Sequence, residues 1–161
     1  MQVPGEGFGA WPHPTTLLCL DALDGIGAGA AIDLGCGSGL LSQAWATRHG
    51  QVVAVDLDPR AIAHARASFA HARPLHAISL RHAPIARVLV DATAQVLLAN
   101  VPPIVHREIA HAVPATTRTM LVSGVRTGEA APLLGEYRGL GFDVIAASEA
   151  AGWGCWVLER R

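Results

Sequence analysis

The residues best suited to chemistry in this sequence lie where apolar segments end. Asp33 closes the first apolar segment and runs into the alternating glycines Gly35, Gly37 and Gly39. Asp56 closes the next apolar segment, roughly twenty residues beyond the glycines. A carboxylate at this spacing, at the carboxyl end of a neighbouring parallel strand, can accept both hydrogen bonds of a ribose diol. The spacing therefore predicts a binding site for a nucleoside cofactor.

The positions of the glycines indicate which nucleoside is bound. A dinucleotide fingerprint G-x-G-x-x-G counted from Gly35 requires glycine where Leu40 stands, whereas the third glycine here is Gly39. A G-x-G-x-G loop preceded by an acid passes close under a smaller ligand, and Asp33 attracts a cationic group. S-adenosylmethionine, with its ammonium and sulfonium, meets these demands better than NAD does. The alternative interpretation is an ordinary glycine-rich turn between a strand and a helix.

Asn100 is the candidate catalytic residue. It is the only asparagine of the chain, and it stands between an apolar segment and Val101-Pro102-Pro103. Its side-chain carbonyl can accept a hydrogen bond from an amine and so direct the nitrogen lone pair toward an electrophilic methyl group. Asparagine before prolines is also a common turn former. The expected position at a strand end beside the glycine loop favours the catalytic interpretation, with direct in-line methyl transfer and no metal.

These residues require a framework of alternating strands and helices. Strands are expected over residues 30–34, 52–56, 75–80, 96–99, 119–123, 142–147 and 155–158. Helices are expected over residues 15–23 (capped by Thr15 or Thr16), 40–49, 59–71, 104–113 and 129–140, and residues 1–14 form an irregular arm. This alternation predicts an α/β domain spanning residues 1–161, with a mainly parallel sheet covered on both faces. The last two strands are expected to form a hairpin.

Composition limits the classes of function that this chain can have. With 161 residues, of which 51% are hydrophobic and 16% charged, the chain can bury a core without disulfides. The net charge is −1 and the twelve basic residues are all arginines spread along the chain, so no nucleic-acid footprint is evident. The absence of lysine excludes Schiff-base chemistry by this chain. No membrane-spanning segment or signal peptide is evident, and we expect a cytoplasmic protein.

The other candidate ligands and aromatic residues indicate no second site. Cys19, Cys36 and Cys155 are scattered without metal spacing and are expected to be free thiols. Four histidines and one glutamate are expected on solvated helix surfaces, without a third ligand at metal spacing: His64, His71, His106, His111 and Glu108. Three tryptophans either border a substrate opening or are packing residues: Trp11, Trp153 and Trp156.

Several segments together carry a family resemblance. They are Phe-Gly-Ala-Trp-Pro-His-Pro-Thr-Thr over residues 8–16, the glycine loop, Val-Asp-Leu-Asp-Pro over 55–59, Ala-Asn at 99–100, and the tail segments 121–125 and 152–156. This set, covering nearly the whole chain, resembles the methyltransferases that modify large-subunit ribosomal protein eleven. The resemblance implies a Rossmann-like class I S-adenosylmethionine-dependent methyltransferase, a three-layer sandwich around a seven-stranded sheet.

The resemblance also implies a role for each part of the site. The arm and Thr16 fold over the methionine part of the cofactor, the glycine loop lies under it, Asp56 holds the ribose, and Asn100 faces the transferring methyl group. The implied cofactor-binding residues are Phe8, Gly9, His13, Thr16, Asp33, Gly35, Gly37, Gly39, Asp56, Leu57 and Asn100. The expected reaction is N-methylation of a protein side chain or a small amine.

Two departures from the family pattern leave alternatives open. Ala10-Trp11 stands where the family has Thr-Gly, which removes a hydroxyl and a flexible residue close to the cofactor. The family's separate N-terminal docking domain is expected to be absent, so the acceptor is a protein or a small molecule, with a separate docking subunit as one possibility. Two alternatives are a non-catalytic S-adenosylmethionine-binding module that serves a partner protein and an NAD-dependent oxidoreductase.

Overall fold

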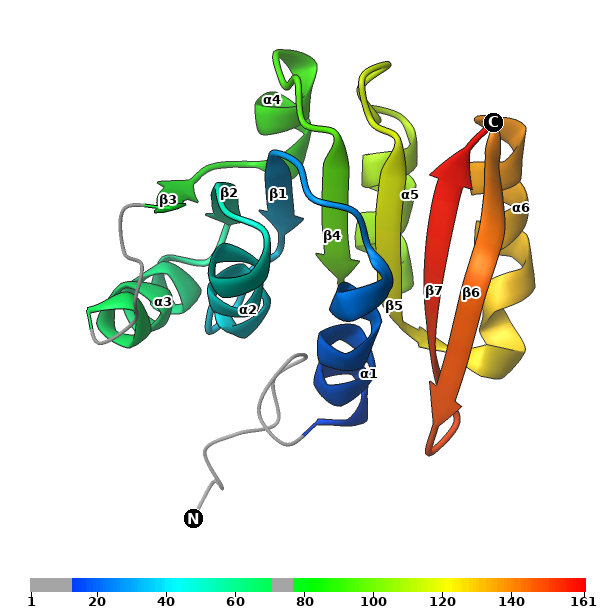
Figure 1. Ribbon diagram of the computed structural model, residues 1–161, viewed down its shortest axis with the longest axis horizontal. Coiled ribbons are helices and arrows are strands. Elements are labelled where there is room, and N and C mark those ends of the chain that lie inside the picture. The colour runs from blue at the N-terminus through cyan, green and yellow to red at the C-terminus, as the bar shows by residue number, and fades with distance from the viewer. Residues whose placement is uncertain (1–12, 71–76) are drawn as a thin grey trace.

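The computed structural model describes residues 13–70 and 77–161, and seven strands in this part of the chain form one sheet (Figure 1). The strands are β1 (Ala31–Leu34), β2 (Val52–Asp56), β3 (Ile78–His82), β4 (Val96–Asn100), β5 (Thr119–Arg126), β6 (Phe142–Ala150) and β7 (Trp153–Arg160). Their order is β3-β2-β1-β4-β5-β7-β6. The first five strands are parallel, and β7 pairs antiparallel with both β5 and β6. The predicted mainly parallel sheet with a closing hairpin is confirmed.

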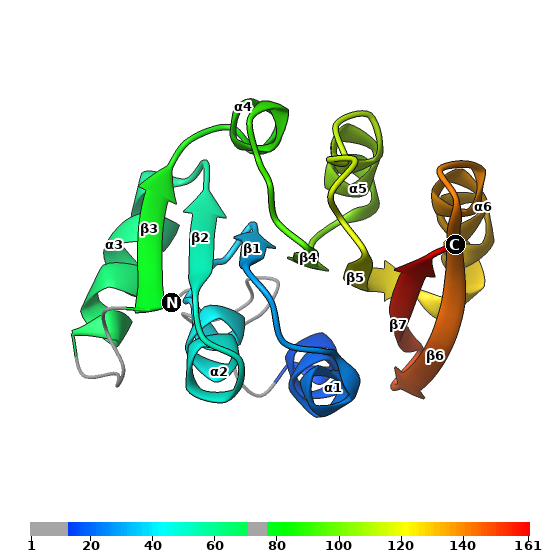
Figure 2. The same ribbon diagram turned by 45° about the horizontal axis from the view of Figure 1, so that its top comes forward.

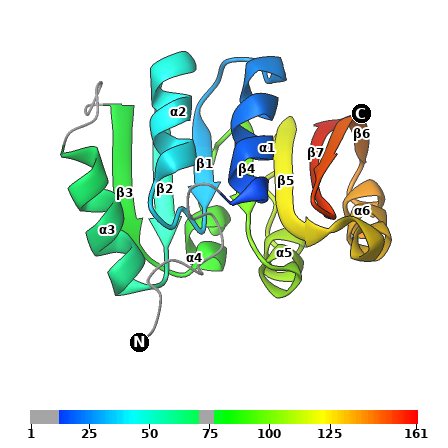
Figure 3. The ribbon, with the colours of Figure 1, turned by 90° about the horizontal axis from the view of Figure 1, so that it is seen from below.

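Helices cover both faces of the sheet, as Figures 2 and 3 show. On one face lie α1 (Pro14–Ala22), α2 (Leu40–Arg48) and α3 (Pro59–Phe69), and on the other lie α4 (Ile85–Val90), α5 (Pro103–Ala110) and α6 (Ala130–Gly139). Two short 3₁₀ turns, η1 (Leu23–Gly25) and η3 (Thr127–Glu129), follow α1 and β5. The predicted three-layer sandwich is confirmed. No helix within the described residues is both long and apolar enough to cross a membrane.

The central strands are apolar on both faces because both faces are covered. All four residues of β1 are buried, and they alternate between two core clusters. Ala31 belongs to the cluster under α1 and α2, whereas Ile32 and Leu34 belong to the cluster under α4, α5 and α6. The alternation continues at Asp33, whose carboxylate accepts a hydrogen bond from Ser42 on α2.

Several element bounds differ from those expected. The third strand covers residues 78–82 instead of 75–80, because the alternation of half-buried Ile78 and Leu80 with exposed polar residues begins only at Ile78. The short helix α4 was not expected, since it buries just Ile85 and Leu89, four residues apart. The hairpin strands β6 and β7 are longer than expected and turn through Ala151 and Gly152, both at positive φ.

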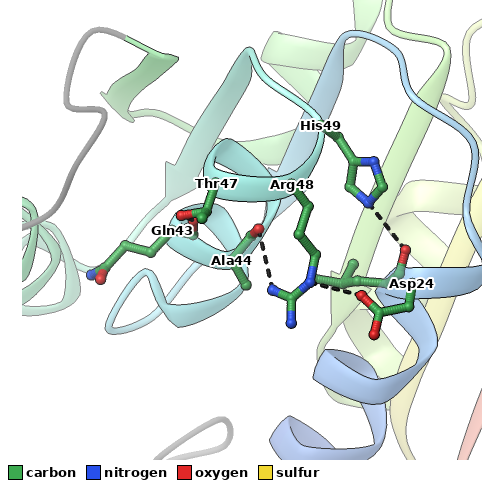
Figure 4. Close-up of polar contacts among 7 residues, drawn as sticks. Asp24, Gln43, Ala44, Thr47, Arg48 and His49 are labelled. Carbon is green, nitrogen blue, oxygen red and sulfur yellow. Dashed lines mark hydrogen bonds and ion pairs between the residues drawn. The ribbon is translucent and has the colours of Figure 1, made fainter.

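The end of α2 is fastened to the end of α1 by polar contacts (Figure 4). Arg48 donates through Nε to Asp24 Oδ1 at 2.8 Å, and His49 Nε2 donates to the Leu23 carbonyl at 3.1 Å. The His49 ring also lies against the Trp45 ring, with 4.4 Å between centroids. Because the ion pair is exposed, its own contribution to stability is small. The contacts together fix the relative position of the two helices that flank the site described below.

Gly124 in β5 is required by a close backbone approach. Its φ is +85°, and a Cβ built on it would lie 2.3 Å from the Val101 carbonyl oxygen. We therefore expect Gly124→Ala to lower the free energy of unfolding by about 2 kcal/mol or more, measured by urea denaturation. The control is Gly135→Ala on α6, where a Cβ meets nothing within 4 Å and alanine is the better helix former. Equal stability of the two variants would show that the approach of Val101 does not restrict position 124.

Candidate functional site

Parallel pairing brings the three predicted polar residues to one edge of the sheet. Leu34, next to Asp33, pairs with Val55 of β2 and with Ala99 of β4. Asp56 and Asn100 each stand one residue beyond these partners, at the carboxyl ends of their strands. The three side chains therefore start from the same edge, as the motif spacing predicted.

A pocket opens at this edge, with about 280 Å³ of empty space including its mouth. Among the described residues, its lining consists of Thr16, Asp33, Gly35, Cys36, Ser38, Leu40, Leu41 and Asn100. Thr16, Asp33, Gly35 and Asn100 were predicted as site residues. Sequence reasoning missed Cys36, Ser38, Leu40 and Leu41, although their place within or directly after the glycine loop was a signal that could have found them.

The backbone conformation and close contacts of the loop require glycine. Gly35, Gly37 and Gly39 all have positive φ, of 69°, 53° and 81°. A Cβ on Gly35 would lie 2.5 Å from a Val101 methyl carbon, and a Cβ on Gly39 would lie 2.4 Å from the Phe69 ring. These short distances mean that any side chain would displace the loop or its neighbours.

Asp56 is oriented by two backbone amides. Its Oδ2 accepts a hydrogen bond from the Gly37 amide and its Oδ1 accepts one from the Asp58 amide, both at 2.9 Å. Each carboxylate oxygen keeps a further lone pair. The carboxylate is half-buried and lies outside the lining of the pocket. Leu57, the next residue, is 63% exposed and presents apolar surface beside it.

Asp33 is a buried carboxyl group. Its Oδ2 accepts a 2.6 Å hydrogen bond from Ser42 Oγ on α2. Burial raises the pKa of Asp33 to about 6, with a smaller upward contribution from the charge on Asp56, against the lowering effect of Ser42. A cationic ligand group in the pocket would favour the ionised form. The role of Asp33 as the group that attracts a cationic ligand stays a prediction.

Two polar atoms of the pocket lining are buried without a hydrogen-bond partner among the described residues. They are Thr16 Oγ1 and Asn100 Oδ1. Buried side-chain oxygens in native proteins are nearly always hydrogen-bonded, so these two point to groups of a ligand. Val96, Leu98 and Asn100 share one face of β4, the face that α1 covers.

The N-terminus of α1 differs from expectation. The N-cap is His13 and not Thr15 or Thr16, and its Nδ1 accepts a hydrogen bond from the Thr15 amide at 3.3 Å. The His13 ring contacts the half-buried Trp153 edge-to-face, with 5.2 Å between centroids. Trp156 lies in the core, as a packing residue. Phe8, Gly9 and Trp11 lie outside the described residues.

The prediction that His106 lies on a solvated surface was wrong. His106 is fully buried, its Nε2 donates to the Ser123 carbonyl at 2.8 Å, and its Nδ1 lies 3.0 Å from the Tyr137 hydroxyl. Burial lowers the pKa of His106 to about 4, so the ring is neutral at pH 7. The missed signal was its spacing of three from the buried Ile109 on the same helix. His64, His111 and Glu108 are exposed as predicted, and His71 lies outside the described residues.

Known proteins resemble this chain over almost all of its length. The family model described as "Ribosomal protein L11 methyltransferase (PrmA)" matches residues 3–161. The ribosomal protein L11 methyltransferase of Xylella fastidiosa strain Temecula1 is 33% identical over 161 residues, covering 93% of this chain and 51% of the relative. That of Geobacter sulfurreducens is 32% identical over 163 residues, covering 97% and 52%. The chain thus spans about half the length of these curated relatives.

Solved structures agree on the fold. A ribosomal protein L11 methylase from Lactobacillus delbrueckii subsp. bulgaricus has a TM-score of 0.78 at 21% identity, over 92% of this chain and 79% of that one. Magnesium protoporphyrin IX methyltransferase (ChlM) from Synechocystis PCC 6803, solved with bound SAM, has a TM-score of 0.68 at 15% identity, over 91% and 77%. These likenesses confirm the class I methyltransferase fold. Since the family model extends over nearly every residue that forms the sheet edge and its pocket, this chain belongs to the ribosomal protein L11 methyltransferase family, a family of S-adenosylmethionine-dependent enzymes.

Proposed function

We propose that this chain is an S-adenosylmethionine-dependent methyltransferase domain that methylates nitrogen on a protein side chain or a small amine. The observation that carries this proposal is the unpartnered Asn100 Oδ1, buried in the pocket that Asp33 and the glycine loop also line. Family membership supports the same activity. S-adenosylmethionine supplies an electrophilic methyl group on a sulfonium.

Residues in and around the pocket fit the parts of this cofactor. The glycine loop lies beneath it, the carboxylate of Asp56 accepts the ribose hydroxyls, and the exposed side chain of Leu57 packs against the base. Asp33 draws the cationic methionine end into the pocket, where Thr16 Oγ1 makes a hydrogen bond with it. His13 is the N-cap of α1, and the family resemblance assigns it to the same cofactor together with Phe8 and Gly9.

Asn100 orients the nucleophile. Its carboxamide oxygen accepts a hydrogen bond from the N–H of an uncharged amine, which leaves the lone pair directed at the methyl carbon. Because Asn100 is 8% exposed, the contact forms where bulk water is largely excluded. An oxygen acceptor would instead need a general base to remove its proton.

The methyl acceptor is best assigned as a protein. The relatives are named for methylating ribosomal protein L11, and we propose L11 as the first acceptor to test, which places the reaction in the cytoplasm. A small amine, or a protein presented by a separate docking subunit, is the second candidate. The glycine spacing and the family match both disfavour an NAD-dependent oxidoreductase.

The activity is tested by transfer of a tritiated methyl group from S-adenosylmethionine to purified ribosomal protein L11 and to a panel of small amines. We expect Asn100→Ala to lower kcat by about a hundredfold, because an unaligned amine rarely reaches the attack geometry. Its affinity for S-adenosylhomocysteine, measured by calorimetry, should stay near that of the wild type.

Gln51→Ala is the matched control, since Gln51 carries the same amide group on the surface just before β2 and should leave kcat unchanged. Full activity of Asn100→Ala would remove Asn100 from the mechanism. Cofactor binding by the wild type without transfer to any acceptor in the panel would favour the non-catalytic binding module instead.

The pKa of Asp33 predicts how cofactor affinity depends on pH. Folding raises this pKa from 3.8 to about 6, so the ligand-free protein loses stability as the pH rises from about 4 to about 6, while Asp33 ionises. Only the ionised carboxyl attracts the cationic cofactor, so its dissociation constant should increase about tenfold between pH 7 and pH 5. Calorimetry of the wild type and Asp33→Asn checks this, with neutral 5′-methylthioadenosine as the control ligand. A wild-type affinity for S-adenosylmethionine that is constant over this range would contradict the assigned role.

A further inference from the structure

The carbonyl of Ser123 joins the Asn100 loop to a buried histidine. It accepts a hydrogen bond from the Val101 amide at 3.2 Å and a second one from His106 Nε2 at 2.8 Å. Val101 directly follows Asn100, and His106 stands in the first turn of α5, just after the loop. One acceptor atom on β5 therefore holds both ends of the segment that follows Asn100.

The arrangement fixes the tautomer of His106. The Ser123 carbonyl can only accept, so Nε2 must carry the hydrogen. Nδ1 then accepts from the Tyr137 hydroxyl on α6, which lies 3.0 Å away and is closer to Nδ1 than to its other acceptor, the His106 carbonyl at 3.4 Å. Desolvation lowers the pKa of His106 to about 4, which keeps the ring neutral and this pattern intact at pH 7. Tyr137 and Ser123 thus define the orientation of the imidazole from opposite sides.

The loop itself offers few other attachments. Pro102 and Pro103 have no amide hydrogen, so the Val101 amide is the last backbone donor between Asn100 and Ile104. Gly124 approaches the Val101 backbone so closely that no Cβ fits there. Ser123 is held in turn by its hydroxyl, which donates to the Gly154 carbonyl at 2.8 Å. The Asn100 side-chain oxygen has no partner of its own among the described residues, so its direction depends on this backbone support.

We infer that His106 is a positioning residue, which holds the Val101 backbone through the Ser123 carbonyl and thereby aims the Asn100 carboxamide into the pocket. This inference rests on the proposed function and extends it to a residue that lines no part of the pocket. An aliphatic side chain at position 106 would fill the same space without the free-energy cost of burying a polar ring. The hydrogen bond to Ser123 is what such a side chain cannot supply.

The kinetic test compares three variants, with S-adenosylmethionine as donor and ribosomal protein L11 as acceptor. We expect His106→Leu to lower kcat about tenfold, with KM for S-adenosylmethionine nearly unchanged, because the amine is misaligned while the cofactor contacts remain. His106→Gln, whose amide can still donate to Ser123, should recover most of the rate. Thr117→Val is the control for general destabilisation, since it removes another buried hydrogen bond, to the Ala94 carbonyl, and should keep kcat.

A double-mutant cycle separates positioning from a purely structural role. If His106 acts through Asn100, His106→Leu should cost little further activity in the Asn100→Ala background. Independent, multiplicative losses would overturn the inference, as would equal kcat losses in His106→Leu and Thr117→Val.

The orientation of the Asn100 side chain can also be tested without measuring catalysis. Because the chain has a single asparagine, labelling with ¹⁵N-asparagine gives one side-chain amide pair in an NMR spectrum. With S-adenosylhomocysteine bound, this pair should shift or broaden in His106→Leu, return in His106→Gln, and stay in place in Thr117→Val. An unchanged pair in His106→Leu would overturn the inference. A wild type that methylates no acceptor would defeat the proposed function, and the spectrum would still decide whether His106 positions Asn100.

Discussion

The site depends above all on the parallel pairing of β1 between β2 and β4. Parallel neighbours end at the same edge of a sheet, so residues that are far apart in sequence emerge side by side there. The pairing aligns Leu34 with Val55 and Ala99, and the polar residues stand next to these three positions. A shift of one residue would turn the side chain of Asp33 to the opposite face of the sheet, away from Ser42 and the pocket. The buried alternation of β1 between two cores makes such a shift costly.

The charged side chains described at the pocket are acidic. Among the described residues that line it, Asp33 is the one formally charged side chain, and Asp56 stands nearby at the next strand end. Two neighbouring acids favour a cationic ligand over a neutral one, and the effect is larger where water is excluded. Methyl transfer from a sulfonium leaves a neutral thioether, so the acids attract the product less than the donor. We therefore expect this electrostatic arrangement to favour exchange of product for fresh donor.

The sequence predicted those parts of the structure that have local signals. Glycine spacing, apolar runs and a proline at the start of α3 located the loop, the central strands and most helices. The lining residues Ser38 and Leu41 were missed although they stand within or directly after the glycine loop, whereas the N-cap role of His13 depends on the exact start of α1. For His106, the spacing from Ile109 indicated the buried face of α5, but nothing near position 106 in the sequence indicates that Ser123 and Tyr137 will enclose the ring.

The two helix layers contribute to the site in different ways. The α1 and α2 side supplies Thr16 and the partner of Asp33, and the side chain of Asn100 belongs to the same face. His106 and Tyr137 lie in helices of the opposite layer, and His106 contacts the backbone of β5 at Ser123, whose carbonyl also accepts from the Val101 amide just beyond β4. The Ser123 carbonyl can accept both bonds because its oxygen has two lone pairs, one used by the Val101 amide and one by His106. Support from the layer without the ligand can therefore be rigid without occupying space that the cofactor needs.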